Sequence, residues 1–474
     1  MNDRAGSSGR LQAELLLLPI GLAAAWVIAG AVRPGVVAAA GLGAVLLILS
    51  VLSMRLAIHL TIFAMLLSPE IWVAGLGTGG SASRGLTVRF EDALIPILAF
   101  GWLLRLALVK EGGLFRGSSI HGPFFGFIGW VALCTLIAVW GRLAAGDSRV
   151  ATPLLYVLKY AEFLVLFILV VNYVTAEAEI RALLRSLFLT ALLVSLYAVL
   201  LNPTGRASAP FEGPEGEPNT LGGFLVFILG LVAGLFVHRV RFGGRWGLPA
   251  LGAVLLVTLA QTLSRASFLG FGVMGLAVAW RLRRKPAVVA AMLAAAIVVG
   301  FLMTPDSVRE RIDYTFAKQT YKDQIKIAGV GFDESTNARL MTWRDILSDI
   351  SSRPVFGFGA GSGFVDAQYP RVLREAGLPG LLLFLFLIYR TWGLTRPRPG
   401  ADSDLAAGLR EGFRFGLIGL LVHAVGSNTW YIVRIMEPFW LVAGFLAVLE
   451  KAKPSGPDVP EPVPAMGETD QEGM

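Results

Sequence analysis

The segment NTLGGFLVFILGLVAGLFVH, Asn219–His238, is apolar over almost its whole length and decides the class of fold. A run of about 20 apolar residues has the length that spans the hydrocarbon of a bilayer as an α-helix. The rest of the chain has the same character, with 55% hydrophobic residues, 16% charged residues and a mean hydropathy of +0.67. These values lie outside the range of soluble domains, so the sequence predicts an all-α polytopic membrane protein.

Apolar runs of similar length recur along the chain and predict about 12–14 transmembrane helices. They cover residues 11–32, 35–53, 56–76, 91–109, 122–141, 152–174, 182–201, 219–238, 247–263, 266–281, 286–304, 377–394, 413–430 and 435–449. One long polar connection interrupts the series, and the tail is Pro-rich and acidic, which is typical of disorder. The predicted divisions are a transmembrane bundle at 1–304, a large loop at 305–376, C-terminal transmembrane helices at 377–452 and a disordered cytoplasmic tail at 453–474.

The short connections indicate the orientation of the chain, because cytoplasmic loops of membrane proteins keep an excess of Lys and Arg. Basic clusters at 239–245, 281–285 and 390–414 predict that their side of the membrane, and both termini, are cytoplasmic. The segment 305–376 is then external. The formal net charge of +8 reflects this topology and contact with anionic membrane lipids, and it gives no reason to expect nucleic-acid binding.

Cysteine and histidine contribute little to the predicted chemistry. The single cysteine, Cys134, lies within an apolar run and excludes an internal disulfide. No Cys or His cluster has the spacing of metal ligands, so neither a metal nor another cofactor is predicted. Lys159 and Glu162 lie three residues apart within an apolar run, and we expect them either to neutralise each other or to lie beside a substrate path.

Three arginines on the predicted outer side require an explanation. Arg206 precedes the Asn219 helix, Arg265 lies in a three-residue turn between two spans, and Arg339 lies in the external segment. An arginine at such a boundary is costly unless it meets an anion or reaches lipid phosphate by snorkelling. A planar guanidinium binds phosphate oxygens bidentately, so three converging arginines predict a site for a lipid-linked diphosphate.

The residues around Arg339 predict an amphipathic helix on the outer membrane surface. Its apolar positions recur at helical spacing, and Arg339 and Trp343, four residues apart, share a face. A polar side chain just before the helix is expected to cap its N-terminus. The candidate caps are Ser335, Thr336 and Asn337.

Four ordered stretches, GEPNTLGG, TLSRASFLGF, NARLMTWRDIL and REAGLPGLLLFL, resemble the O-antigen ligase and O-antigen polymerase superfamily. The resemblance covers about residues 200–380. It implies a GT-C-like, metal-independent membrane glycosyltransferase of the bacterial inner membrane with a periplasmic active site. The implied donor is an undecaprenyl-diphosphate-linked glycan, the implied acceptor is a glycan or a lipid-linked acceptor, and other polysaccharide assembly proteins are implied partners. The family arginines that hold the diphosphate match Arg206, Arg265 and Arg339.

The sequence departs from the family at the position of the expected base. Many members carry HNxYL nine residues before the Glu of the last stretch, and that histidine is taken to activate the acceptor. Here Asp366 occupies the position and Tyr369 follows it. Asp366 is the expected base unless it is an ordinary loop acid; Glu375 and Glu217 are its rivals, and Glu375 alternatively braces the entry of the next helix.

This departure favours one branch of the superfamily. The ligase branch depends on the histidine, so its absence favours a polymerase of O-antigen or exopolysaccharide repeat units over a ligase that transfers glycan to the lipid A core of lipopolysaccharide. A lipid-linked oligosaccharide transporter is an alternative of another class. Transporters commonly have internal repeats and binding charges at the bilayer midplane. The sequence shows no repeat, and its outstanding arginines lie at the predicted outer face.

The stretch SAPFEGPEGEPNTLGG, Ser208–Gly223, then has an expected role beside the donor. Asn219 is expected to cap a helix that begins at Thr220, whose N-terminal amides favour anions. Glu212, Glu215 and Glu217 either accept hydrogen bonds from sugar hydroxyls or form a solvated acidic loop. The glycines at its end, Gly222 and Gly223, permit close approach by a neighbouring helix or a lipid tail. The residues expected to contact the substrate are Asn219, Glu212, Trp343 and Tyr369.

Overall fold

The structure is a computed structural model of the chain, and it is all-helical apart from two short ribbons. It describes residues 34–68, 70–72, 87–109, 116–147, 150–201, 206–210, 216–285, 326–327, 330–331, 334–363 and 365–451. Four predictions lie outside these residues: the spans at 11–32 and 286–304, the tail from 453, and the contacts made by Glu212 and Glu215.

The described residues form thirteen α-helices and one 3₁₀ helix. The helices are α2 (Pro34–Leu52), α3 (Met54–Leu67), α4 (Phe90–Val109), α5 (His121–Ala144), α6 (Ala151–Tyr173), α7 (Glu177–Leu200), α8 (Pro218–Val237), α9 (Gly247–Thr262), α10 (Arg265–Arg281), α13 (Glu334–Asp349), η1 (Ile350–Ser352), α14 (Gln368–Gly393), α15 (Asp404–His423) and α16 (Val433–Lys451). The two antiparallel ribbons pair β1 (Glu70–Trp72) with β2 (Thr87–Arg89) and β3 (Lys326–Ile327) with β4 (Val330–Gly331). The predicted all-α polytopic class is confirmed.

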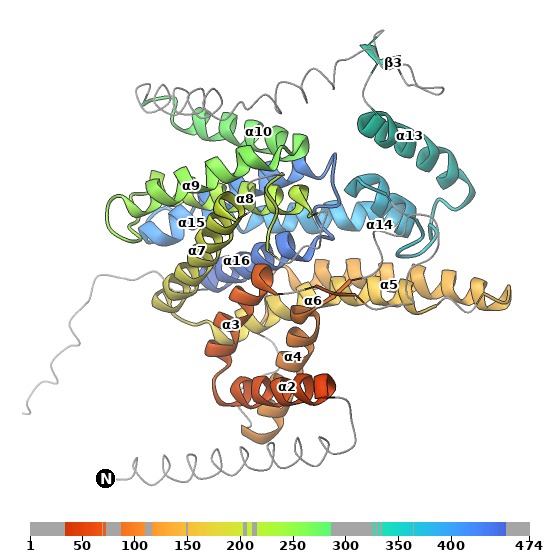
Figure 1. The fold of residues 1–474 in the computed structure, drawn as a ribbon, viewed down its shortest axis with the longest axis horizontal. Helices are drawn as coiled ribbons and strands as arrows, with labels where there is room; N and C mark the ends of the chain where they lie inside the picture. Colours follow the sequence, from red (N-terminus) through yellow and green to blue (C-terminus); the bar gives the residue numbers. More distant parts are fainter. Residues whose placement is uncertain are drawn as a thin grey trace, which may run out of the picture.

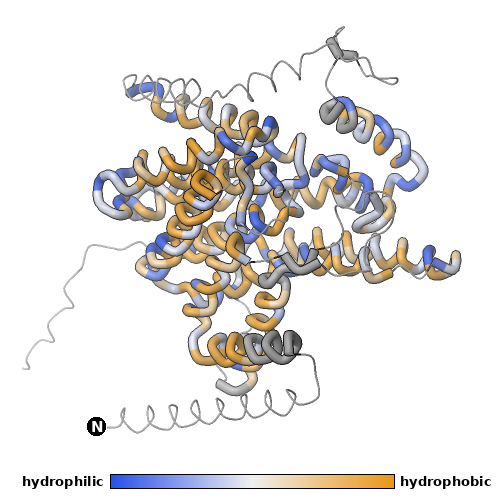
Figure 2. Tube along the Cα trace, in the orientation of Figure 1, coloured by the Kyte–Doolittle hydropathy of each residue, from blue (hydrophilic) through white to orange (hydrophobic). Residues whose placement is uncertain are grey.

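Five of the described helices are long and apolar enough to cross a membrane: α5, α6, α7, α8 and α14. Apolar residues cover most of the bundle helices, whereas hydrophilic residues gather at helix ends, in the connections and on α13 (Figure 2). Lys159 and Glu162 lie within α6 with Nζ and Oε2 3.7 Å apart, so the predicted mutual neutralisation is confirmed. The predicted and observed helix ends mostly agree to within a few residues.

Helices α8 and α15 form the centre of the bundle and pack with their backbones in contact (Figure 1). A Cβ added to Gly234 would lie 2.1 Å from the backbone nitrogen of Gly412, and one added to Gly230 would lie 2.4 Å from that of Gly416. No side chain fits at such distances, so glycine is required for this approach. Helix α10 packs on α15, α16 packs on α6 and α8, and α14 packs on α5.

Helix α14 begins nine residues before the predicted span at 377, and it has a kink at Gly377, where φ is +67°. Helix α15 likewise begins at Asp404, before the predicted 413. Both differences have the same cause: polar side chains in the first turns of each helix are buried against partners instead of facing water. The predicted caps of the external helix are wrong, because α13 already begins at Glu334 and includes all three residues.

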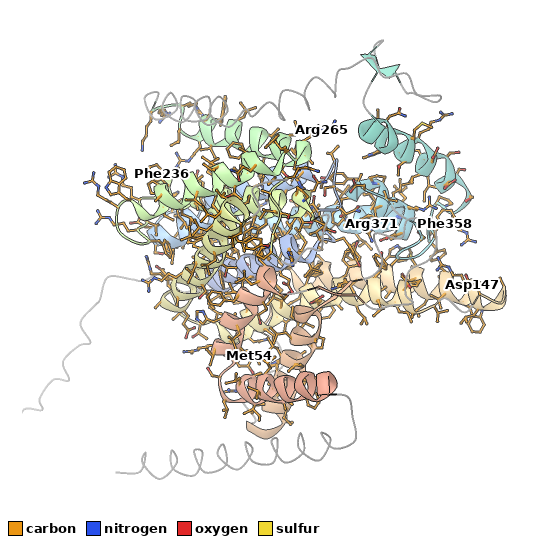
Figure 3. All side chains as sticks on the ribbon, in the orientation of Figure 1. Met54, Asp147, Phe236, Arg265, Phe358 and Arg371 are labelled. Carbon is orange, nitrogen blue, oxygen red and sulfur yellow. The ribbon has the colours of Figure 1, made fainter. Side chains whose placement is uncertain are left out.

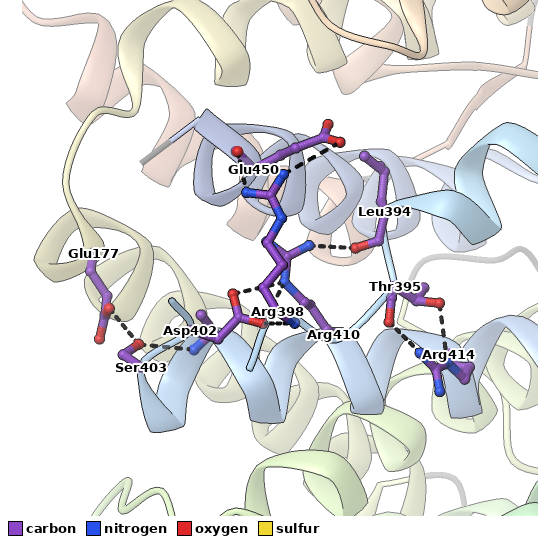
Figure 4. Close-up of polar contacts among 10 residues, drawn as sticks. Glu177, Leu394, Thr395, Arg398, Asp402, Ser403, Arg410, Arg414 and Glu450 are labelled. Carbon is purple, nitrogen blue, oxygen red and sulfur yellow. Dashed lines mark hydrogen bonds and ion pairs between the residues drawn. The ribbon is translucent and has the colours of Figure 1, made fainter. Parts of the chain in front are cut away.

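A cluster of charged residues ties the N-terminal half of α15 to the C-terminal ends of α14 and α16 (Figure 4). The Nε of Arg410 lies 3.1 Å from Asp402, and its Nη1 donates to the carbonyl of Leu394 at 2.6 Å. Arg398 pairs with Glu450 at 4.0 Å, and the Nε of Arg414 donates to the hydroxyl of Thr395 at 3.1 Å. Each charge has a protein partner, so these ion pairs and hydrogen bonds hold this end of α15 in place.

Candidate functional site

The N-termini of α8 and α10 lie side by side and share a network of hydroxyl and amide groups. The hydroxyl of Ser264 donates to the side-chain carbonyl oxygen of Asn219 at 2.7 Å, and the hydroxyl of Ser267 donates to that of Ser264 at 2.7 Å. A Cβ on Gly222 would lie 2.1 Å from the Ser267 hydroxyl oxygen, so glycine allows this approach, as predicted. Two helix N-termini at one place concentrate partial positive charge and favour an anion.

Arg206 holds the turn that leads from α9 into α10. Its Nε donates to the carbonyl of Thr262 at 3.0 Å and its Nη2 to the carbonyl of Leu263 at 3.2 Å. Leu263 has φ +50°, in the left-handed region that a non-glycine residue rarely adopts. The guanidinium has five N–H donors, and at least two serve this turn. Arg206 therefore fixes the backbone two residues before Arg265.

Arg265 is the first residue of α10, half-buried, and directly follows Ser264. The structure therefore brings together two of the three predicted diphosphate-binding arginines and one predicted substrate contact. We call Arg206, Asn219, Ser264 and Arg265 the arginine site. Arg265 and Arg371 lie toward the same side of the view in Figure 3, and Phe236, near the other end of α8, lies toward the opposite side.

The prediction that Asn219 caps a helix starting at Thr220 is wrong. Helix α8 begins at Pro218, with Glu217 at the N-cap position, because proline is favoured in the first turn where its missing N–H is not needed. Glu217 instead accepts a hydrogen bond from the hydroxyl of Thr220 at 2.8 Å. The side chain of Asn219 is used between helices, on Ser264.

The third predicted arginine, Arg339, lies in α13, where the structure describes its backbone and not its side chain. Trp343 on the same helix is half-buried, and Ile346 is buried. Helix α13 is joined to α14 by an ion pair between Arg374 Nη1 and Asp349 Oδ2 at 3.0 Å. A contact between Arg339 and the arginine site stays a prediction.

Asp366 lies half-buried just before α14, in a segment that packs against the turn following α15. The backbone N–H of Gln368 donates to the carbonyl of Ala424 at 3.0 Å, and the hydroxyl of Tyr369 donates to the carbonyl of Leu421 at 2.8 Å. The same turn reaches α10, since a Cβ on Gly426 would lie 3.5 Å from the Cβ of Ala266. One turn therefore contacts both the α10 entry and the Asp366 segment.

Tyr369 and Glu375, two further predicted site residues, have structural partners. Besides the Tyr369 hydroxyl bond, Glu375 is 3% exposed and its Oε1 accepts from Arg371 Nε and from the backbone N–H of Gly361, both at 3.0 Å. The guanidinium of Arg371 also lies 4.0 Å from the ring centroid of Tyr431. Glu375 thus braces the entry to α14, which is the structural one of the two roles predicted for it.

The glycine run at 357–363 forms tight turns that wrap around α14 at its kink. Gly357, Gly359 and Gly361 all have positive φ, which side chains rarely adopt. The N–H of Phe358 donates to the carbonyl of Arg374 at 2.8 Å, and the N–H of Gly359 donates to that of Glu375 at 3.0 Å. These bonds and the Glu375 carboxylate anchor the glycine run before α14 to the bundle.

Two buried arginines were not among the predicted site residues. Arg371 lies one helical turn before Glu375, and this i, i+4 spacing of opposite charges could have indicated the pair. Arg434, at the start of α16, is fully buried and donates to the carbonyls of Pro210 and Ser68, both at 3.2 Å. Backbone carbonyl partners leave no mark in a sequence, so nothing indicated this role.

Among the described residues, the structure defines a polytopic helical membrane protein in which the arginine site lies at two adjacent helix N-termini. Residues 250–385 match the family model described as O-antigen ligase. The chain therefore carries a domain of the O-antigen ligase and polymerase superfamily, and the resemblance seen in the sequence is confirmed. The match includes Arg265, Asp366 and Glu375, whereas Arg206 precedes it. No curated protein matches the chain.

Proposed function

We propose that this protein polymerises lipid-linked polysaccharide repeat units, transferring a glycan from undecaprenyl diphosphate at the periplasmic face of the bacterial inner membrane. The observation that carries the proposal is the arginine site, where Arg206 holds the turn that delivers Arg265 beside two helix N-termini. A diphosphate is the anionic group that guanidinium forks and helix N-termini bind well. The family match supports a glycosyltransferase of this superfamily.

The transfer itself needs one proton acceptor and stabilisation of one leaving group. An acceptor hydroxyl attacks C1 of the donor sugar, the new C1–O bond forms, and the C1–O bond to the diphosphate breaks. Undecaprenyl diphosphate leaves as an anion, and the arginines stabilise the charge that develops on it. We assign the hydroxyl proton to Asp366, a general base of the kind that contributes about 10²–10⁴-fold to a rate.

The choice of Asp366 over its rivals rests on its position, where the resemblance places the family base, and on the segment that carries it. Glu375 is buried between Arg371 and Gly361, and Glu217 accepts the hydroxyl of Thr220 in the first turn of α8. Asp366 lies in a segment connected to the α10 entry through the turn after α15. This arrangement supports a base on the segment before α14 that acts on an acceptor beside a diphosphate held at the α10 entry.

The remaining contacts complete the proposed site from the external segment. Arg339 would supply the third guanidinium from α13, and Trp343, four residues on, would offer an aromatic face to a sugar. The ion pair between Asp349 and Arg374 holds this helix near the α14 entry. Asn219 would act on the donor side, where its amide already lies against Ser264.

A ligase that transfers the completed glycan to lipid A core or another acceptor is the second candidate. This activity is the one named in the description of the family model that matches residues 250–385, O-antigen ligase. The aspartate at position 366, where ligases carry a histidine, favours polymerisation. A lipid-linked oligosaccharide transporter would need the same donor-binding site but no base.

A deletion strain separates the three candidates. Its surface glycan and its lipid-linked pool are analysed together, and the strain is complemented with the unmodified gene or with Arg265→Ala. Loss of long chains with single repeats retained supports the polymerase. Long chains that accumulate on the lipid carrier without attachment support the ligase, and repeat units trapped on the cytoplasmic side of the membrane would support the transporter and overturn the proposal.

A further inference from the structure

A buried strap connects three parts of the molecule beside the arginine site. The strap is residues 206–210, which form neither helix nor strand, and all of its residues after Arg206 are buried. The N–H of Ala207 donates to the carbonyl of Gln261 at 2.8 Å, which fixes its first half to the C-terminal end of α9. A Cβ on Gly216 would lie 2.5 Å from the hydroxyl oxygen of Ser208, so the chain that follows packs on its middle.

Arg434 fixes the other end of the strap. Its side chain is fully buried at the start of α16, with Nη1 on the carbonyl of Pro210 and Nη2 on the carbonyl of Ser68, at the end of α3. The planar fork of a guanidinium can reach two carbonyls at once, which a lysine ammonium on a flexible stem does not reproduce. Pro210 has no N–H, so its carbonyl is the backbone group through which this residue can be held.

Arg434 and Arg206 are linked through the backbone of the strap. Arg434 holds residue 210, the strap carries Arg206, and Arg206 holds the carbonyls of Thr262 and Leu263 in the turn that delivers Arg265. A strap without regular secondary structure keeps its place only through such bonds, because buried backbone carbonyls are costly to leave without a donor. Movement at residue 210 would therefore displace Arg206 and, through it, the α10 entry.

We propose that Arg434 is a positioning residue for the diphosphate site: it does not touch the donor but holds the strap that orients Arg206 and the turn before Arg265. The inference rests on the proposed function for the identity of the ligand. The geometry of the strap does not depend on that identity. Its main consequence is expected at the donor, because the two hydrogen bonds of Arg434 go to the strap and to the end of α3 and neither goes to the Asp366 segment.

The first test measures backbone amide hydrogen exchange of residues 207–209 in the purified full chain, relative to exchange in the interior of α8. Arg434→Lys is expected to speed exchange of these amides about tenfold by allowing the strap to open locally. The matched control is Arg410→Lys. Arg410 is also a buried arginine that donates to a backbone carbonyl, that of Leu394, but it lies in the N-terminal half of α15, away from the strap. Unchanged strap exchange in Arg434→Lys, or equal change in both variants, overturns the proposal.

The unmodified protein provides a test that needs no variant to fold. Amides 207–209 are expected to exchange as slowly as buried helix amides, although they belong to no helix. Exchange as fast as that of the exposed turn at Gly243–Gly244 overturns the proposal.

The second test is kinetic and uses an undecaprenyl-diphosphate-linked oligosaccharide as the donor. Arg434→Lys is expected to lower kcat/KM for the donor about tenfold, because the displaced arginines both bind the diphosphate and stabilise the charge that develops on it. An unchanged kcat/KM in a variant whose strap exchanges faster overturns the positioning role. If Arg265→Ala retains full transfer, the diphosphate assignment fails, and the exchange result still decides whether Arg434 holds the strap.

Discussion

The Nε of Arg206 lies 3.0 Å from the carbonyl oxygen of Thr262, so an arginine predicted to bind substrate also closes the C-terminal end of a helix. The same guanidinium reaches the carbonyl of Leu263, whose left-handed backbone sets the direction of α10. Arg206 and Arg265 are therefore coupled through one turn. Residues coupled in this way have non-additive effects when they are substituted together.

Arg265→Ala is expected to abolish glycan transfer while the protein still inserts and folds, because it removes a phosphate-binding fork and no apolar surface. Arg265→Lys keeps the charge without the fork and should recover transfer only in part. Arg206→Ala should also abolish transfer, and the double variant should lose no more than the worse single one. Transfer to a defined acceptor is the measurement, and Arg241→Ala, an exposed arginine in the connection after α8, is the control. Full transfer in both alanine variants would rule out the diphosphate role.

Asp366→Asn is expected to lower kcat by about 10²–10⁴-fold with little change in donor binding, because the amide cannot accept the hydroxyl proton. Glu217→Gln and Glu375→Gln are the comparison variants, with rates expressed per folded molecule. Glu217→Gln should stay near the unmodified rate. If Asp366→Asn turns over normally while one of the other amides does not, the base has been assigned to the wrong carboxylate.

Glu375→Gln is expected to destabilise the fold by about 3–5 kcal/mol, because it leaves the charge of Arg371 buried without its carboxylate. The pair is buried on both sides, with 7% and 4% of the two side chains exposed. Replacing both residues by leucine should recover part of the loss, since no uncompensated charge then remains. Thermal unfolding in detergent measures both variants, and a Glu375→Gln protein as stable as the unmodified one would contradict the brace.

Gly234→Ala is expected to destabilise the bundle by about 1–3 kcal/mol or more, because its Cβ would meet the backbone of Gly412, which cannot rotate away. Gly272→Ala on α10 is the matched control. A Cβ there has nothing within 4 Å, so helix propensity should make the change neutral or stabilising by up to about 1 kcal/mol. Equal unfolding temperatures for the two variants would refute the close packing of α8 and α15.

Reporter fusions test the predicted topology. Fusions within 320–335 are expected to report an external position, and fusions after Arg284 or Pro399 an internal one, because Lys and Arg accumulate in cytoplasmic loops. Alkaline phosphatase and a fluorescent protein that matures only in the cytoplasm give opposite readouts. An internal signal from the fusions within 320–335 would place Asp366 and its segment on the wrong side for the proposed reaction.

The sequence predicted most membrane helices closely, since an apolar run of spanning length has few other structures available. It failed where polar residues belong to a helix and find partners inside the protein. Arg410 and Arg414 made the first half of α15 look like a loop, yet they bind Leu394 and Thr395. Gln368 likewise made the start of α14 look like a loop, yet its backbone N–H donates to the carbonyl of Ala424.

The site was predictable to the extent that motifs carry it. Arg265 and Asn219 were singled out from local sequence, and Asn219 accepts a hydrogen bond from Ser264, the residue directly before Arg265. The bonds of Arg206 to the turn before α10 and the place of Arg434 were not predictable, because both depend on backbone carbonyls distant in the chain. Such partners are set by tertiary packing, and any residue type can provide them.

The glycine contact between α8 and α15 also bears on where a polyprenyl tail would lie against the protein. Two helices whose backbones touch leave no lipid-filled gap at the contact, so the tail of a donor held at Arg265 would not pass between them there. Helix α10 begins at that arginine and presents Phe268, Leu269 and Leu276 on its surface, 38%, 57% and 70% exposed. The hydrocarbon of the carrier would stay in the lipid phase along this apolar surface of α10, while its diphosphate enters the protein.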